Sequence, residues 1–296
     1  MITIHKYTAG NKQEWDEFIR KSRNGTFLFL RDYMDYHSDR FRDHSLMYTN
    51  AKGRLIAVMP ANECDGVLHS HQGLTYGGIV MDSQLRTTGV GEIFSCTMEY
   101  LKQQGFREWT YKQMPDIYHL IPSEEDEYWL WRNGAELTAC GISSTIRLQA
   151  PTLNFEQLRK RCINKAQKAG YTVEENAPLE DFWPIMEQNL MERYSLKPVH
   201  TLEEMQRLQG KLPEHIECFI CRNSTGAPVG GAVIYKSNSK VVHVQYPHAS
   251  AEGKRNGAID FLYAHLLEKY ANQGYTFLCG DLTTENLAVQ ENIAYL

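Results

Sequence analysis

Two stretches of the sequence repeat one pattern, Glu99-Tyr-Leu-Lys-Gln-Gln-Gly-Phe106 and Glu268-Lys-Tyr-Ala-Asn-Gln-Gly-Tyr275. In each stretch a helical pattern ends at a glycine, which adopts the left-handed conformation of a helix C-cap without steric cost. An aromatic residue then begins a run typical of a strand, over 106–111 in the first copy and 275–279 in the second. The copies lie about 170 residues apart, which predicts a duplicated unit of that size.

A second match, earlier in each copy, predicts a β-hairpin. The turns Asn50-Ala-Lys-Gly53 and Asn223-Ser-Thr-Gly226 each follow one short apolar run and precede another. Asn and Gly tolerate the backbone conformations that tight turns demand. Because both matches occur in the same order and at nearly the same offset, duplication explains them better than chance does.

The apolar periodicity of each copy predicts the same order of elements: helix, hairpin, long strand, turn, helix and strand. The predicted helices are 12–21, 91–104, 124–131, 155–168, 179–194, 202–209 and 257–272. The predicted strands are 45–48, 55–59, 74–80, 106–111, a hairpin at 217–236, 240–246 and 277–281, with a closing strand pair or bend at 136–148. The predicted fold class is α/β (α+β), with tandem domains at 1–150 and 151–296, each a mixed, mainly antiparallel sheet flanked by helices.

The first copy places a glycine-containing segment between a predicted strand and a predicted helix. The segment Arg86-Thr-Thr-Gly89-Val-Gly91 combines a cation with two glycines. Glycines let a backbone approach a phosphate closely, and a helix N-terminus offers unpaired N–H donors and positive potential. We expect Arg86, Gly89 and Gly91 to bind the phosphates of a donor, and an ordinary surface turn is the alternative.

The corresponding segment of the second copy is less regular. It reads Tyr246-Pro-His248-Ala-Ser250, then Gly253-Lys254-Arg255-Asn256-Gly257 at the start of a predicted helix. Two glycines, two cations and an asparagine suited to an N-cap keep the character of a phosphate site. Lys254, Arg255, Asn256 and Gly257 are therefore predicted to contact the donor.

These features resemble the GNAT superfamily of acyltransferases and, within it, the FemAB-like proteins. The first-copy segment is similar to the GNAT signature (Arg or Gln)-x-x-Gly-x-(Gly or Ala). The second copy is similar to FemAB-like proteins in its basic helix at 158–170, its strand and turn at 243–253, and its strand with Gly280 and Asp281. The resemblance covers nearly the whole chain. It implies two tandem GNAT-like domains, the second shortened at its end near Leu296.

The resemblance implies transfer of an acyl group from acyl-CoA to an amine. The amine would belong to a small metabolite, an amino sugar or a cell-envelope precursor. Acyl-CoA would be a co-substrate, and no permanently bound cofactor is expected. A FemAB-like transferase that uses aminoacyl-tRNA is one alternative. A non-catalytic binding module is another, because a fold alone does not establish catalysis.

Transfer to an amine needs a base and a proton donor close to the reacting carbonyl. His243, Tyr246 and Asp281 are the candidate catalytic residues, because they lie beside the second-copy turn. Strand alternation predicts His243 and Gln245 on one face of the strand and Tyr246 on the other. The alternative for each is a packing role, which is common for a half-buried tyrosine.

The candidate substrate-binding residues are His71, Tyr76, Arg161, Lys165 and His248. His69 and His71 would share a strand face, but no third ligand has a recognisable spacing, so we expect no metal site. A substrate-lining role at the domain interface suits the His71 and Tyr76 cluster better. Arg161 and Lys165 share a helix face that could meet phosphates, although a solvated face is the commoner outcome.

The composition bounds the remaining possibilities. The 296 residues are 42% hydrophobic and 23% charged, with a net charge of −5, and no apolar run has the length of a membrane span or signal peptide. We expect no DNA binding and no membrane insertion, and tRNA is weakly supported, because polyanion affinity needs clustered Lys and Arg. The seven cysteines have irregular spacing and fit a reducing compartment, so the expected location is the cytoplasm.

Overall fold

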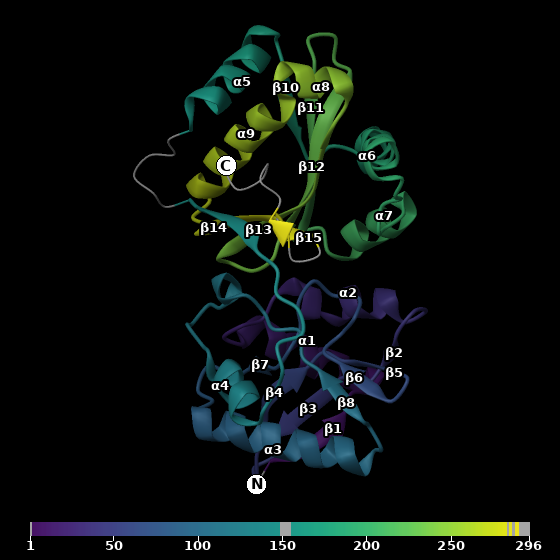
Figure 1. Ribbon diagram of the computed structural model, residues 1–296, viewed down its shortest axis with the longest axis vertical. Coiled ribbons are helices and arrows are strands. Elements are labelled where there is room, and N and C mark those ends of the chain that lie inside the picture. Colours follow the sequence, from purple (N-terminus) through teal and green to yellow (C-terminus); the bar gives the residue numbers. More distant parts are fainter. Residues whose placement is uncertain (1, 149–154, 283, 286–287, 290–296) are drawn as a thin grey trace. The chain divides into compact units, whose positions relative to one another are not determined.

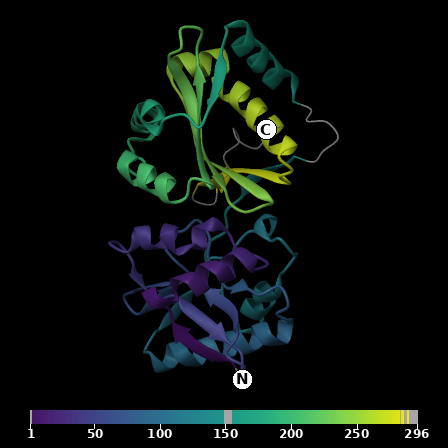
Figure 2. The same ribbon diagram turned by 180° about the vertical axis from the view of Figure 1, so that it is seen from behind.

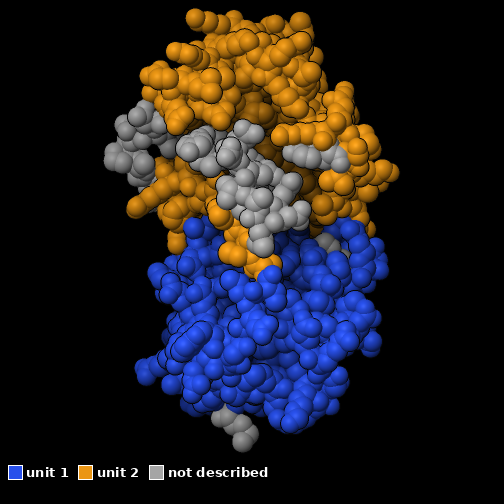
Figure 3. All heavy atoms as spheres, in the orientation of Figure 1, with its two compact units in different colours: residues 1–138 blue, residues 139–296 orange. Residues whose placement is uncertain are grey.

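The computed structural model describes residues 2–148, 155–282, 284–285 and 288–289. The chain divides into two compact units, residues 1–138 and 139–296 (Figure 3). The division falls before residue 150, where the sequence places the domain boundary. Among the described residues, no helix is long and apolar enough to cross a bilayer.

The first unit contains two four-stranded sheets, ordered β1-β3-β4-β7 and β2-β5-β6-β8. Its strands are β1 (Thr3–Lys6), β2 (Arg42–Asp43), β3 (Leu46–Thr49), β4 (Leu55–Met59), β5 (Asn62–Cys64), β6 (Val67–His69), β7 (Val80–Met81) and β8 (Glu108–Thr110). Its α-helices are α1 (Lys12–Lys21), α2 (Arg31–Met34), α3 (Thr87–Gln103) and α4 (Glu125–Arg132). In Figure 1, α3 covers one side of the first sheet and α1 and α2 lie on the other. Apolar residues of α3, among them Ile93 and Phe94, pack against β3, β4 and β7.

The second unit is built on one six-stranded sheet, ordered β10-β11-β12-β13-β14-β9. Its strands are β9 (Ser143–Arg147), β10 (Thr172–Glu175), β11 (Ile216–Arg222), β12 (Pro228–Lys236), β13 (Val241–Ala249) and β14 (Phe277–Leu282). Its helices are α5 (Gln157–Lys168), α6 (Leu179–Tyr194), α7 (Leu202–Lys211), α8 (Ala251–Asn256) and α9 (Ala258–Asn272), and β15 (Thr284–Glu285) pairs with β16 (Ala288–Val289). Figures 1 and 2 show α5 and α9 on one face of the sheet and α6 and α7 on the other.

The duplicated turns have the same geometry in both units. Gly53 and Gly226 adopt φ values of +74° and +82°. In each turn the glycine N–H donates to the backbone carbonyl of the asparagine three residues earlier, at 2.8 Å in the first unit and 2.9 Å in the second. The C-cap glycines Gly105 and Gly274 match as well, with φ values of +79° and +86°. The predicted fold class of two tandem units, each with a mixed, mainly antiparallel sheet flanked by helices, is confirmed.

Two segments differ from the predicted elements. Residues 143–147 form β9, which pairs with β14 and so completes the second sheet rather than closing the first. The predicted strand 74–80 is mostly irregular, and only Val80–Met81 forms β7. His71 has a φ of +70°, which breaks any strand at that point. His69 and His71 therefore do not share a strand face, because β6 ends at His69.

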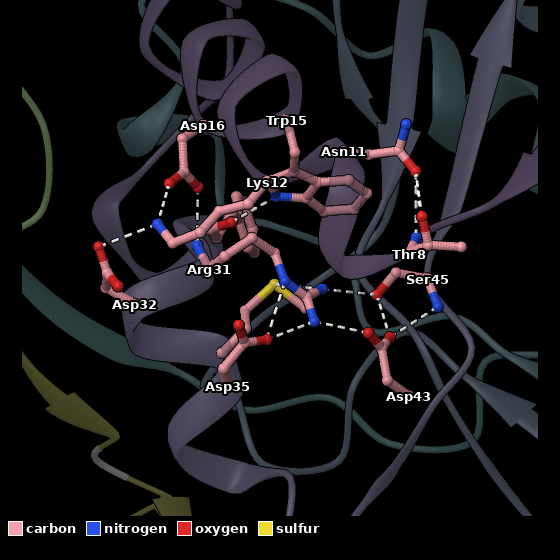
Figure 4. Close-up of polar contacts among 12 residues, drawn as sticks. Thr8, Asn11, Lys12, Trp15, Asp16, Arg31, Asp32, Asp35, Asp43 and Ser45 are labelled. Carbon is pink, nitrogen blue, oxygen red and sulfur yellow. Dashed lines mark hydrogen bonds and ion pairs between the residues drawn. The ribbon is translucent and has the colours of Figure 1, made fainter.

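A buried arginine joins the helices and strands of the first unit (Figure 4). Arg31 is 3% exposed, and its Nη2 atom lies 2.5 Å from a carboxylate oxygen of Asp35 and 2.5 Å from one of Asp43. Its guanidinium also lies over the Tyr7 ring, 3.8 Å from the ring centroid. Its backbone N–H donates to Asp16 of α1 at 2.8 Å. These contacts fix α2 between α1 and the segment that leads from β2 into β3.

Replacing Arg31 by leucine is expected to lower the free energy of unfolding by about 2–4 kcal/mol, because two carboxylates lose the cation that compensates them. Arg42→Leu is the matched control. Arg42 pairs with Glu63, but its side chain is 81% exposed, so its loss is expected to cost about 0–1 kcal/mol. Urea unfolding of the full chain measures both values, and equal losses would contradict the structural role of Arg31.

Candidate active site

Strand β13 carries a β-bulge at Gln245. In the ladder with β12, Val244 and Tyr246 lie opposite consecutive residues, so Gln245 is an extra residue in β13. A bulge shifts the alternation of side chains beyond it by one position. His243, Tyr246 and His248 therefore lie on one face of the sheet. The prediction that His243 and Tyr246 lie on opposite faces is wrong, because it assumed unbroken alternation.

The parallel strands β13 and β14 separate soon after they begin. Their described ladder pairs Val241–His243 with Phe277–Cys279 and stops there. β13 nevertheless continues to Ala249 and β14 to Leu282. Beyond His243, the backbone N–H and C=O groups on the β14 side of β13 are therefore not part of the described pairing between these two strands. Such an edge can pair with another extended chain.

Tyr246 lies beyond the point of separation and contacts a histidine that sequence reasoning missed. The Tyr246 hydroxyl lies 2.6 Å from Nδ1 of His200. His200 precedes Thr201, the N-cap of α7, and the side chains of His200 and Tyr246 are both buried. The Trp183 ring of α6 packs against the Tyr246 ring edge-on, with centroids 6.2 Å apart. The sequence does contain a signal next to His200. The pattern Thr201-x-x-Glu204 is a capping box, which fixes the start of a helix and therefore the residue just before it.

The two other polar residues of this face differ in exposure. His243 is buried, whereas His248 is half-buried at the end of β13. Burial, together with the positive charge of Lys254, lowers the pKa of His248 to about 4. Its imidazole is therefore neutral at neutral pH. Asp281 is part of β14, and its side chain lies outside the described residues.

The second-unit residues predicted to bind phosphate fall into two groups. Lys254 and Arg255 are exposed on α8 and stay candidates for an anionic donor. Asn256 instead ends α8 and donates to the Tyr171 hydroxyl at 2.9 Å, so it is not the N-cap of α9. Gly257 has a φ of +79°, and a Cβ there would lie 2.4 Å from the carbonyl oxygen of Cys162.

The basic helix α5 lies against α8 and α9. Lys165 donates through Nζ to the Arg255 carbonyl at 2.5 Å. This hydrogen bond links α5 to α8. Arg161 is exposed on α5. Of the two residues predicted on this helix to bind substrate, Arg161 therefore stays a candidate with an exposed side chain, and Lys165 already has a structural contact.

The first-unit segment predicted to bind phosphate is occupied by protein. A Cβ on Gly91 would lie 2.3 Å from the Trp129 ring, and the Trp129 indole N–H donates to the Thr87 carbonyl at 2.9 Å. Arg86 is the exposed N-cap of α3. Gly89 and Glu92 line an open depression of about 700 Å³ beside this helix start. The same depression is also lined by Lys52 and Arg54, so its lining carries charges of both signs.

Tyr111, just after β8, occupies the position in the first unit that corresponds to Gly280 in the second. Its side chain reaches the residues that precede β7. The repeated pattern aligns Phe106 with Tyr275 and therefore Tyr111 with Gly280. The Tyr111 hydroxyl accepts the Ile79 N–H at 2.8 Å and donates to Asp126 at 2.7 Å. At Gly280, an added Cβ would meet, among the residues that the structure describes, only the Ser144 carbonyl oxygen, at an ordinary 3.5 Å. The second unit thus has a glycine at the position where the first unit has a tyrosine.

The other first-unit candidates are buried. His71 is 3% exposed, and its Nδ1 atom accepts the Gly73 N–H at 3.2 Å. Tyr76 is equally buried and packs on the rings of Phe29 and Tyr118. Among the described residues, no group of three or more His, Cys, Asp and Glu side chains could hold a metal ion. Burial raises the pKa of the Cys218 and Cys221 thiols to about 12, so both are unreactive as nucleophiles.

Replacing Gly91 by alanine is expected to lower the free energy of unfolding by about 1–3 kcal/mol, because the methyl group overlaps the Trp129 ring. Gly89→Ala in the same helix is the control. There the methyl group meets only the mobile end of Leu85, at 2.8 Å, and the gain in helix propensity offsets that contact. Thermal or urea unfolding measures both variants. Equal stability of the two would show that Trp129 does not fill this site.

His248 is expected to make the protein less stable as the pH falls from about 6.5 to 4. In this range the unfolded chain binds a proton at His248 that the folded chain does not. His248→Gln should therefore lose less stability than the wild type between pH 7 and pH 5. Lys254→Met should lie between them, because it removes one of the causes of the low pKa. Urea midpoints at both pH values test this order, and identical declines in all three proteins would refute it.

Comparison with known proteins supports the fold. No family model and no curated protein matches the sequence. FemX is similar over 96% of this chain and 90% of its own, with 14% identity and a TM-score of 0.65. L-PGS from Bacillus licheniformis is similar over 93% of this chain and 80% of its own, with 13% identity and a TM-score of 0.60. A tandem GNAT protein from the clavulanic acid biosynthesis pathway is similar over 97% and 91%, with 10% identity and a TM-score of 0.53. The fold of this chain is therefore that of tandem, FemAB-like GNAT proteins.

Proposed function

We propose that this protein is an acyltransferase whose donor binds in the second unit, where β13 and β14 separate. The acyl group would pass from acyl-CoA or a similar activated donor to an amine of a small metabolite, amino sugar or cell-envelope precursor. The observation that carries the proposal is the difference between Tyr111 and Gly280. One copy has a tyrosine side chain at this position, hydrogen-bonded to Ile79 and Asp126, and the other has a glycine.

The shape of an acyl-CoA donor suits this separation. Its pantetheine arm is extended and carries two amides, so it can hydrogen-bond to the edge of β13 as an added strand would. The arm would run past Gly280, whose lack of a side chain leaves room for it. The exposed cations Lys254 and Arg255 on α8 are placed to attract the phosphates of the donor.

The polar face of β13 suits the chemistry of transfer. An amine must lose a proton when it attacks a carbonyl carbon, and the leaving group must gain one. Tyr246, with His200 beside it, is the candidate proton donor. His248 is neutral at neutral pH, but a pKa of about 4 makes it a weak base. It is better suited to accept a hydrogen bond from the amine than to hold its proton. His243 and Asp281 remain candidates on the same strands.

A donor linked to tRNA is the second candidate. The fold similarity to FemX and the exposed basic side chains of α5, such as Arg161, favour it. A tRNA donor would add a requirement for phosphate contacts whose affinity falls steeply with salt. The acyl-CoA proposal predicts a much weaker dependence on salt, because only the few phosphates of CoA take part.

Gly280→Tyr should abolish donor binding, because it places in the second unit the same side chain that Tyr111 has at the aligned position of the first unit. Gly280→Ala is the matched control and should bind as the wild type does. Binding is measured as a thermal shift with acetyl-CoA, longer acyl-CoAs and bulk tRNA. A ligand at 100 times its dissociation constant stabilises the folded protein by about 2.7 kcal/mol. No shift with any donor would refute the proposal, as would a full shift in Gly280→Tyr.

Charge reversal tests which unit meets the phosphates. The double variant Lys254→Glu, Arg255→Glu should weaken acyl-CoA binding at least about tenfold, since charge-assisted hydrogen bonds become repulsive. Arg86→Glu, at the exposed N-cap of α3, should leave binding unchanged. The opposite result would place the donor in the first unit.

A further inference from the structure

The position of His200 is fixed by the helix that follows it. The Thr201 hydroxyl accepts the Glu204 N–H at 3.2 Å, and the Glu204 carboxylate accepts the Thr201 N–H at 2.7 Å. This reciprocal cap orders the start of α7. On the other side, α6 ends at Tyr194, and its C-cap Ser195 has a left-handed conformation with a φ of +54°. A short connection between two anchored helices thus carries His200 to the sheet.

The partner of His200 is fixed just as firmly. Tyr246 lies next to the bulge in β13, where it follows Gln245 and faces α6. The carbonyl of Ala249, at the end of the same strand, accepts a hydrogen bond from Asn189 of α6 at 3.0 Å. His200 and Tyr246 are 6% and 8% exposed. A hydrogen bond between two such groups is stronger than one in water, because the surroundings are less polarisable.

We propose that His200 is a positioning residue that turns the Tyr246 hydroxyl into the proton donor for the leaving sulfur of a thioester. The inference rests on the proposed function. For Tyr246 to donate its own proton to the sulfur, its oxygen must accept the hydrogen bond from His200. Nδ1 of His200 therefore carries the hydrogen. A hydrogen bond donated to the phenol oxygen stabilises the phenolate and so makes the phenol a better acid.

In the proposed step one covalent bond forms and one breaks at the acyl carbon. The amine nitrogen forms a bond to the acyl carbon, and the bond between that carbon and sulfur breaks. Tyr246 gives its hydroxyl proton to the departing sulfur, so the products are an amide and a free thiol. Water returns a proton to the phenolate oxygen, and His200 keeps its Nδ1 proton and the hydrogen bond that it donates throughout. The proton that the nitrogen loses on forming the amide goes to water.

Three substitutions of His200 separate positioning from simple structural support. His200→Ala is expected to lower kcat about 10- to 100-fold and to change KM for the donor little, because donor binding does not use this pair. His200→Asn should restore much of the rate, because its amide N–H can replace the Nδ1 donor. His200→Asp should not, because a carboxylate can only accept. Equal rates for the Asn and Asp variants would overturn the proposed direction of the hydrogen bond.

A double-mutant cycle tests whether His200 acts through Tyr246. Tyr246→Phe should lower kcat as much as His200→Ala or more, and the double variant should be no slower than Tyr246→Phe alone. If the loss of kcat in the double variant were instead the product of the losses in the two single variants, the proposal would be overturned. His265→Gln is the control: this histidine lies on α9, on the other face of the sheet, where it contacts Glu175 at 2.8 Å, and its loss should leave kcat unchanged.

The outcomes distinguish this inference from the proposed function. If the wild type binds no acyl-CoA and releases no thiol in the presence of amines, the proposed function fails. If the wild type transfers acyl groups and His200→Ala transfers them at the same rate, only the role of His200 fails. Acyl-CoA thermal shifts of each variant show whether the folded state and the donor site are intact.

Discussion

Backbone N–H and C=O groups need hydrogen-bond partners when they are buried, and the two units differ in the side chain that is available at one such place. In the first unit the Tyr111 hydroxyl accepts the Ile79 N–H, so a side chain takes the place of a neighbouring strand. In the second unit the aligned residue is Gly280, which has no side chain to offer. The proposed donor would pair with the β13 edge beyond His243 as an added strand would, and the proposed chemistry follows from that position.

Three glycines of this protein allow close packing of neighbouring groups. Trp129 occupies the space above Gly91, and the Cys162 carbonyl lies against Gly257. The Phe182 ring of α6 comes within 2.7 Å of where a Cβ of Gly231 would stand. Each glycine lets a helix or an aromatic ring approach a backbone. A glycine-rich segment can therefore look like a phosphate loop in sequence when its space is already filled.

The sequence predicted what depends on local pattern. The helices 12–21 and 179–194, the two asparagine–glycine turns and the C-cap glycines follow from residues close in the chain, and the duplication follows from them. Long-range features were not predictable. The bulge at Gln245 changes which side chains share a face, and it is visible only in the pairing of β13 with β12. His200 lies 46 residues from Tyr246, and no spacing rule connects them.

The pairing of β9 with β14 has a practical consequence for work on the separate halves. A polypeptide cut at residue 150, where the sequence suggests a boundary, would leave β9 with the wrong half. The isolated second half would then present the β14 edge, with Phe277, Leu278 and Cys279, to solvent. Uncovered strand edges of this kind recruit other chains and lead to self-association. A cut before Ala139 keeps the strand with its sheet and gives the second half its best chance of staying monomeric.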